Sequence, residues 1–382
     1  MSHDHIDLDR AATTPVHVDV LDAMLPYFRE RAGNPSSIHA AGRMARRGLE
    51  EARERVAAAL RAAPSAVIFT SGATEALHLG VFGTLASRGE RAHVVSAVTE
   101  HAATLAAVRT AQRRGAEVTW IEPDADGVID PDEVVRALRD DTALVALMRV
   151  NNETGVITDV ARVGDAVRER RGALLVDAVQ AFGMEEVSLD AFRADMIALS
   201  AHKVEGPKGI GALVVRPGLR LEGVTLGGAQ ERGLRAGTPA VASAVGFGVA
   251  AEFAATGAPD RARRVAALRD ALEAAIAAHE GVLVNGAGAP RGPKHLNVRI
   301  AAVDGEALLI NLDGEGVLAS AGSACAAGSI EASHVLMAMG LSRVEAASSV
   351  RFSLDDHLDH ADVARAATRI VRAIARTRAV PV

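Results

Sequence analysis

Short apolar runs alternate with longer amphipathic stretches along the first 215 residues of the chain. The apolar runs are four to eight residues long and predict buried strands, whereas the stretches between them have the period of helices. Strands are predicted at residues 66–70, 93–97, 117–121, 143–150, 173–176, 195–199 and 212–215, and helices at 45–61, 74–86, 102–114, 131–139 and 159–169. This alternation predicts an α/β fold in which helices sandwich a mainly parallel, seven-stranded sheet.

The last third of the chain has a different pattern. A turn-rich break at 255–260 precedes a long helix, rich in Ala and Arg, at 261–279, and shorter strands are predicted at 282–285, 295–300 and 317–320. We interpret this part as a smaller α+β domain, because 382 residues are too many for one compact core. The expected division is a large domain at 16–257, a small domain at 258–382, and an N-terminal segment, 1–15, that packs with the small domain.

Composition restricts the class of protein. Hydrophobic residues make up 49% of the chain and charged residues 24%, as in a globular protein. The net charge of −6 argues against nucleic acid as a direct partner. The sequence lacks both an apolar run of about 18 residues, which a transmembrane helix needs, and a signal-peptide pattern. Cys325 is the only cysteine, so an intrachain disulfide is impossible, and we expect a cytoplasmic protein without membrane contact.

Two ionisable residues follow predicted strands of the large domain. Lys203 lies in the stretch Ser-Ala-His-Lys just past strand 195–199, where a desolvated amine could form an imine with a carbonyl group. Asp177 follows strand 173–176, where its carboxylate could pair with the ring nitrogen of pyridoxal phosphate. A solvated loop lysine and a turn aspartate are the alternatives at these two positions. The carboxyl ends of parallel strands meet at one rim, so we expect a ligand there.

A candidate phosphate site lies at the same rim. The stretch from Thr70 to Thr74 follows a predicted strand, opens a helix and contains Gly72, so its amides and hydroxyls could bind an anion. An ordinary helix cap is the alternative. Ser200 and His202, beside the candidate lysine, could supply further phosphate donors.

Five more residues are candidates for chemistry. His101, past strand 93–97, could stack on a pyridine ring or move protons, or it could be a surface histidine. Asn152 could bind a carboxylate or a cofactor oxygen, and Gln180 a phenolic oxygen. Arg351 could clamp an α-carboxylate, with a structural salt bridge as an equal alternative. Small residues surround Cys325, a context that suits an accessible, reactive thiol, although most cysteines are buried and inert.

Taken together, these stretches resemble the NifS/IscS-type cysteine desulfurases, which are fold-type-I enzymes of the class-V aminotransferase family. The matching motifs lie at 9–15, 33–37, 70–75, 99–101, 150–155, 176–180, 202–211, 231–238, 320–325 and 351–354. The Gly-Ser-Ala-Cys stretch at Cys325 is similar to the long-loop group of that family. Glu205 stands where many relatives carry an aromatic residue, and Ala326-Ala327 replace commoner Ser or Thr, which leaves loop dynamics and partner choice open.

The resemblance implies a role for each candidate. Lys203 is implied to bind the aldehyde of pyridoxal 5′-phosphate and to act as a base at the substrate α-carbon. The implied cofactor ligands are Gly72, Ala73, Thr74, His101, Asn152, Asp177, Gln180, Ser200, His202 and Lys203, together with Thr238, which is implied to reach the partner subunit's phosphate in a homodimer. The implied substrate ligands are Asn34, Asn152 and Arg351. A resident metal is not implied, although Cys325 could ligate a cluster iron transiently.

The reaction implied by the resemblance converts L-cysteine to L-alanine. Cys325, as a thiolate, attacks the substrate sulfur, carries it as a persulfide and donates it to an acceptor protein for iron–sulfur cluster assembly or for tRNA or other thiolation. A selenocysteine lyase or another fold-type-I enzyme, such as an aminotransferase, is the alternative. A non-catalytic scaffold with the same fold is disfavoured because Lys203, Asp177 and His101 are all present.

Overall fold

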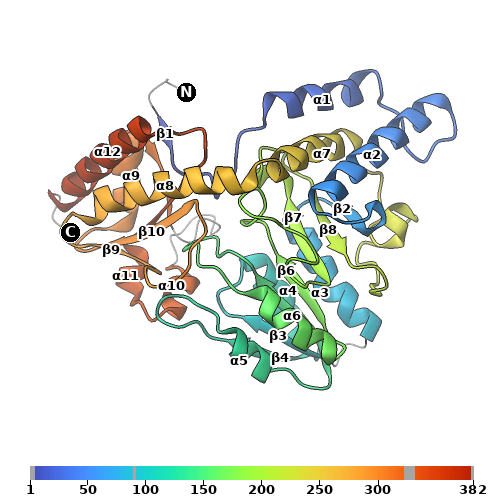
Figure 1. Cartoon of the computed structure of the whole chain (residues 1–382), viewed down its shortest axis with the longest axis horizontal. Coiled ribbons are helices and arrows are strands. Elements are labelled where there is room, and N and C mark those ends of the chain that lie inside the picture. Colours follow the sequence, from blue (N-terminus) through green and yellow to red (C-terminus); the bar gives the residue numbers. More distant parts are fainter. Residues whose placement is uncertain (1–4, 89–91, 322–331, 380–382) are drawn as a thin grey trace.

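A seven-stranded sheet forms the centre of the large domain in the computed structural model, which describes residues 5–88, 92–321 and 332–379 (Figure 1). Its order is β2-β8-β7-β6-β5-β3-β4. The strands are β2 (Val67–Thr70), β3 (His93–Ala97), β4 (Glu117–Ile121), β5 (Thr142–Met148), β6 (Ala173–Asp177), β7 (Met196–Ser200) and β8 (Gly211–Val215). All neighbours pair in parallel except β8, which is antiparallel to β2 and β7. The predicted mainly parallel sheet is confirmed.

Helices cover both faces of this sheet, as predicted. Alternate residues of each strand face opposite sides, so Val145 and Leu147 of β5 belong to one apolar cluster and Leu144 and Ala146 to the other. On the first face lie α2 (Ala40–Ala59), α5 (Pro131–Arg136), α6 (Val160–Glu169) and α7 (Val241–Ala255). On the second lie α3 (Ala73–Arg88) and α4 (Ala102–Arg113). A further helix, α1 (Val18–Arg29), packs on α7.

The small domain contains an antiparallel sheet of order β12-β13-β10-β9. Its strands are β9 (Val282–Val284), β10 (His295–Ile300), β12 (Ser320–Ala321) and β13 (Ser349–Ser353), and its helices are α8 (Ala258–Ala277), α9 (Gly305–Gly314), α10 (His334–Ala338), α11 (Arg343–Ala347) and α12 (His360–Ala379). The N-terminal strand β1 (Ile6–Asp7) pairs in parallel with β11 (Val317–Leu318), and Ile6 and Leu8 belong to this domain's core. The domain boundaries stay a prediction.

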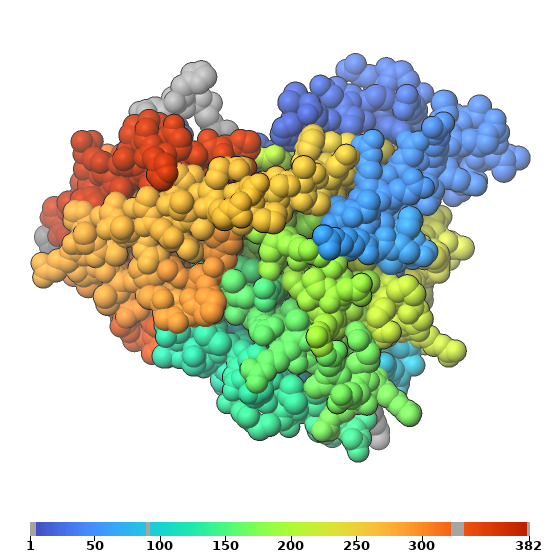
Figure 2. Space-filling model, viewed as in Figure 1, coloured from blue at the N-terminus to red at the C-terminus, as the bar shows by residue number. Residues whose placement is uncertain are grey.

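The chain passes from one domain to the other by a sharp bend between α7 and α8. The predicted loop at 255–260 is too long, because α8 already begins at Ala258 with Pro259 in its first turn and left-handed Gly257 as its N-cap. The two helices bend by 73°. Figure 2 shows α8, in gold, lying across the molecular surface between the orange-red small domain and the blue N-terminal helices.

Helix α2 and one predicted strand of the small domain also differ from the predictions. Helix α2 begins five residues early, at Ala40, because the His39 side chain accepts a hydrogen bond from the Gly42 N–H and caps it. The predicted strand at 317–320 is two short strands, β11 and β12, which pair in different sheets. Within the described part of the chain, no single helix is long and apolar enough to cross a membrane, and α7 and α8 meet that test only as a bent pair.

Candidate active site

A cavity of about 550 Å³ lies at the carboxyl ends of the parallel strands. It is closed on one side by the N-terminal segment Ala11–Thr13 and on another by the small domain, through Arg351. The structure brings eleven of the predicted site residues to its wall: Gly72, Ala73, Thr74, His101, Asn152, Asp177, Gln180, Ser200, His202, Lys203 and Arg351. Residues that are far apart in sequence thus converge at one rim, as expected for an open α/β sheet.

Lys203 lies in the short 3₁₀ turn Ala201–Lys203 that follows β7. Its Nζ donates hydrogen bonds to the carbonyl oxygens of Ala11 and Ala12, each at 2.7 Å. The N-terminal segment therefore holds the amine at the cavity wall. The sequence pattern gave no sign of this contact, because the two partners are backbone groups about 190 positions away.

Asp177 is the last residue of β6 and is buried, with 8% of its surface exposed. Its Oδ1 accepts a hydrogen bond from the Val179 N–H at 3.0 Å. Burial raises the pKa of this carboxyl group, while charge on His101 and Lys203 opposes the shift. A cationic group brought against Asp177 would therefore relieve an unfavourable buried charge.

Gln180 and the N-terminal segment meet on the same side of the cavity. The Gln180 Nε2 donates to the Ala11 carbonyl oxygen at 3.1 Å, which leaves this amide with a second N–H. Its Oε1 is buried and has no hydrogen-bond partner among the described residues. A buried, unpaired amide edge of this kind is costly unless a ligand bonds it.

His101 caps the N-terminus of α4. Its Nδ1 accepts a hydrogen bond from the Ala103 N–H at 3.1 Å, so the neutral ring carries its proton on Nε2. Directly before it, Glu100 is buried, and one carboxylate oxygen accepts from the Met148 N–H at 2.8 Å. Burial raises the pKa of Glu100 well above its ordinary value. The sequence pattern placed Glu100 at the rim, three residues past the end of β3, but indicated no role for it.

The predicted phosphate site is the N-terminus of the 16-residue helix α3. Glu75, in the first turn, accepts from the Ser71 N–H at 2.5 Å and pairs with Arg235 at 2.9 Å, which anchors the turn. Burial alone would raise the pKa of Glu75, but the bonds to Arg235 and Ser71 outweigh it and lower the pKa. The first-turn amides and the Thr74 hydroxyl lie at the cavity wall, where helix amides favour an anion.

His202 lies beside this turn, with its Nδ1 3.1 Å from the Thr13 hydroxyl oxygen. Burial lowers the pKa of His202 to about 4, and the nearby charges of Lys203 and Lys208 act in the same direction. The ring is therefore neutral near pH 7. It could donate a hydrogen bond to a phosphate but would not add a charge.

Arg351, on β13, joins the two domains at the cavity. Its guanidinium pairs with Asp9 at 2.8 Å and donates to the Asn152 carbonyl oxygen at 2.9 Å. Its buried Nε has no hydrogen-bond partner among the residues that the structure describes. The two interpretations from sequence, a structural salt bridge and a carboxylate ligand, are therefore compatible. Arg351 forms the salt bridge and also presents an unsatisfied donor in a ligand-sized cavity.

Two of the predicted residues, Asn34 and Thr238, do not line the cavity in this chain. Asn34 and Thr238 lie on exposed loops of the large domain. Thr238 was assigned to the partner subunit's site, so its position here does not test that role. Cys325 lies outside the described residues, and its place relative to the cavity stays a prediction.

The cavity fits pyridoxal phosphate in three respects. Asp177 offers a buried carboxylate for a protonated ring nitrogen, Gln180 has an unpaired amide edge, and the first turn of α3 is an anion site. The primary amine of Lys203 lies at the same wall and can bind an aldehyde. These groups are complementary to the charges at both ends of that cofactor.

The sheet topology and the small domain define the fold of the fold-type-I enzymes, as predicted. The family model for class-V aminotransferases matches residues 6–365, and the chain belongs to this family. It is 40% identical to cysteine desulfurase 2 of Trichormus variabilis over 376 residues, or 98% of this chain and 94% of the relative.

Two solved structures are similar over most of the chain. One, described as a NifS-like protein, has a TM-score of 0.91 and 31% identity and covers 97% of this chain and 100% of its own. The other, described as SspA in complex with cysteine, has a TM-score of 0.82 and 34% identity, and it covers 91% of this chain and 98% of its own. The resemblance inferred from sequence motifs is confirmed.

Proposed function

We propose that this protein is a pyridoxal-phosphate-dependent cysteine desulfurase that converts L-cysteine to L-alanine. The observation that carries the proposal is the convergence of Lys203, Asp177 and the α3 N-terminus on one cavity that also contains Arg351. The names of similar proteins, which include a cysteine desulfurase and a cysteine complex, support this choice of substrate.

The chain's residues hold the cofactor and tune it. When bound, pyridoxal phosphate supplies a protonated ring that withdraws electrons from the substrate α-carbon. Asp177 keeps the ring nitrogen protonated, because the ion pair offsets the cost of burying its carboxylate. Gln180 would hold the phenolic oxygen, and His101 would hold the ring. The remaining phosphate and cofactor ligands are Gly72, Ala73, Thr74, Asn152, Ser200, His202 and, from the partner subunit in a homodimer, the partner's Thr238.

Substrate binding uses the boundary between the domains. Arg351 is held by Asp9 and by the Asn152 carbonyl oxygen, and its free Nε can donate to the substrate carboxylate. Asn152 and Asn34 are proposed to complete this carboxylate site. Because Arg351 belongs to the small domain and Asn152 to the large one, a bound carboxylate would fix the two domains relative to each other.

Proton movement is assigned to Lys203 and His101. The Lys203 Nζ takes the proton from the substrate Cα, which requires the neutral amine. The His101 Nε2, which carries the ring proton, is on the edge not engaged by Ala103 and passes protons near the substrate. Burial raises the pKa of the Glu100 carboxyl group, which directly precedes His101, although the hydrogen bond from the Met148 N–H opposes the shift.

Sulfur transfer is assigned to Cys325. Its thiolate attacks the substrate sulfur, an S–S bond forms as the substrate C–S bond breaks, and the electron pair of that bond stays with the carbon skeleton, which takes up protons to become alanine. The persulfide then passes to an acceptor protein, for iron–sulfur cluster assembly or for thiolation. We further propose a homodimer in the cytoplasm as the working form.

The test is simultaneous release of alanine and sulfide from L-cysteine with a reductant present. Equal amounts are expected from the wild type, with both lost in Cys325→Ala and Lys203→Ala. Cofactor absorbance should remain in the Cys325 variant, which separates lost chemistry from lost cofactor. Full turnover of cysteine by Cys325→Ala would refute the persulfide step, and turnover of selenocysteine alone would favour a selenocysteine lyase.

A further inference from the structure

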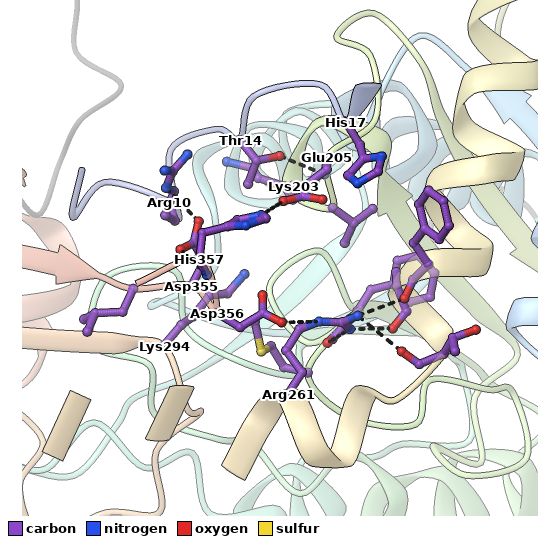
Figure 3. Close-up of a pocket in the computed structure, with 18 residues that line it drawn as sticks. Arg10, Thr14, His17, Lys203, Glu205, Arg261, Lys294, Asp355, Asp356 and His357 are labelled. Carbon is purple, nitrogen blue, oxygen red and sulfur yellow. Dashed lines mark hydrogen bonds and ion pairs between the residues drawn. The ribbon is translucent and has the colours of Figure 1, made fainter. Parts of the chain in front are cut away.

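A second cavity, of about 310 Å³, lies between the two domains on the other side of Lys203 (Figure 3). Lys203 is the only described residue that lines both cavities. The apolar part of its wall comes from both domains: Phe182, Met184, Val204, Phe253 and Leu354. The volume is at the lower end of the range that small-molecule sites occupy, about 300–1,000 Å³.

One amine in this cavity has no hydrogen-bond or ion-pair partner among the residues that the structure describes. Lys294, just before β10, has 3% of its surface exposed, and its side chain lines the cavity (Figure 3). Among the described residues, none forms a hydrogen bond or ion pair with its Nζ, although Asp355 attracts its charge at longer range. Buried lysines are rare unless they are paired, because burial of an isolated ammonium group is costly.

The acids around the cavity are already neutralised, each by a basic side chain. The pairs are Asp355 with Arg10, Asp356 with Arg261 and Arg264, and Glu205 with His357. None of these acids contacts Lys294, whose ammonium charge therefore lacks a contacting counter-ion within the described structure. A negatively charged ligand would satisfy the protonated form of this amine.

The choice of lysine at this position is informative. The chain has 42 lysines and arginines, and the only lysines are Lys203, Lys208 and Lys294. Arginine occupies the other 39 of these positions, including the partners of the cavity acids Asp355 and Asp356. Lysine differs in having a compact ammonium group that can lose its proton when buried.

We propose that this cavity binds a small carboxylate with an apolar body. The carboxylate would pair with Lys294 Nζ, and the apolar body would lie against Phe182, Met184 and Phe253. The proposal concerns a cavity distinct from the desulfurase site and stands whatever the substrate of that site.

A ligand there would act on the adjacent lysine. Its carboxylate would lie in a cavity that shares Lys203 with the proposed cofactor site, because Lys203 lines both cavities. A negative charge in that place favours the protonated form of Lys203. The bound carboxylate would therefore change turnover without competing for the substrate carboxylate site at Arg351.

The protonation state of Lys294 supports an anion site with a pH dependence. Burial, together with the charges of Lys203 and Arg351, lowers the pKa of Lys294 to about 7, although the charge of Asp355 opposes the shift. A carboxylate needs the ammonium form, so its affinity should increase as the pH falls through 7. The other ionisable groups around the cavity are Arg10, His17, Glu205, Arg261, Asp356 and His357.

The test uses the holoenzyme labelled with ¹³C-lysine, because three lysines give few resonances to assign. The signal lost in Lys294→Met identifies Lys294. Benzoate is the probe, and benzyl alcohol, which has the same ring and no charge, is its control. We expect benzoate to shift the Lys294 resonance and to raise its pKa, and benzyl alcohol to do neither. An unchanged Lys294 resonance at saturating benzoate would overturn the proposal.

Two variants separate this cavity from the proposed substrate site. Benzoate binding, measured by saturation-transfer NMR, should be at least tenfold weaker in Lys294→Met, and Arg351→Gln should leave the Lys294 shift intact. Loss of that shift in Arg351→Gln would mean that benzoate acts from the substrate site, and equal benzoate affinity in Lys294→Met would also contradict the proposal. If Lys294→Met does not fold, the signals lost in Lys203→Ala and Lys208→Arg assign Lys294 by elimination, and the wild-type titration and the Arg351 variant still decide the question.

Discussion

Replacing Gly211 with alanine should weaken cofactor binding without touching a cofactor ligand. Gly211 begins β8 and pairs with Thr70 on one side and Ser200 on the other, so it lies between two loops that line the candidate active site. A Cβ at this position would approach the backbone of Gly72 at 2.7 and 2.8 Å and would also meet the Leu199 carbonyl oxygen. Backbone atoms cannot rotate away as a side chain can, so a strand or the Gly72 loop must move.

The size of the effect follows from the cost of inserting atoms into a packed site, about 1–3 kcal/mol. If the loop at Gly72 yields, this energy appears as weaker binding of the phosphate at the first turn of α3. At about 1.4 kcal/mol for each factor of ten, the expected loss of cofactor affinity is roughly 5- to 150-fold. If β8 yields instead, the same energy appears as a lower melting temperature of the apoenzyme.

Both outcomes can be measured on one preparation, by cofactor titration of the apoenzyme and by calorimetry. Gly314→Ala is the matched control, because a Cβ there has no atom within 4 Å and lies at the end of α9, away from the cavity. It should keep wild-type affinity and gain about 0.5–1 kcal/mol of stability. Cofactor affinity and melting temperature both at wild-type values in Gly211→Ala would refute the reasoning.

Three further predictions concern buried and interdomain charges. Burial raises the pKa of Glu153 from 4.5 to about 7, so the protein loses stability as the pH rises through that interval and the buried carboxyl group ionises. Glu153→Gln removes this cost, up to ~3 kcal/mol, and should raise the melting temperature above pH 7. Near pH 4.5 the melting temperature should not change. The bond to Glu205 raises the pKa of His357 above 6.5, so the melting temperature should fall as pH rises through that raised value, and His357→Gln should flatten this dependence. Glu231→Ala should cost about 3–5 kcal/mol in calorimetry, because it leaves Arg53, 5% exposed, buried without its bidentate partner. A wild-type melting temperature in that variant would show that the pair contributes little.

The large sheet could be predicted because its strands are short apolar runs with polar residues at their carboxyl ends. Parallel pairing then brings residues such as His101, Asp177 and Lys203 to one rim, so the principal site followed from strand assignment alone. The family motifs added residue roles that periodicity does not contain. The small domain was harder to predict, because its strands are short and one predicted strand is divided at Ala319 between two sheets.

The parts that could not be predicted depend on contacts between distant segments. Arg351 pairs with Asp9, 342 positions away in the sequence, and Lys203 bonds Ala11, 192 positions away. Local sequence patterns contain no information about contacts between residues so far apart in the chain. The α7–α8 boundary was misjudged for a different reason. Ala, Gly and Pro near residue 257 predict a turn, yet Pro259 fits the first turn of a helix, so the break is short.

One sequence signal was visible and still went unused. All three lysines of the chain, Lys203, Lys208 and Lys294, line one of the two cavities, whereas the many arginines form most of the ion pairs. Arginine keeps its charge in almost any environment, so it suits permanent pairs, and lysine suits positions where an amine must lose a proton or bind a carbonyl. In a chain that uses arginine so consistently, a lysine indicates a site. By this reasoning Lys294, like Lys203, is a candidate site residue. A reagent specific for lysine amines would report the accessibility of the lysines in these two cavities of the described structure.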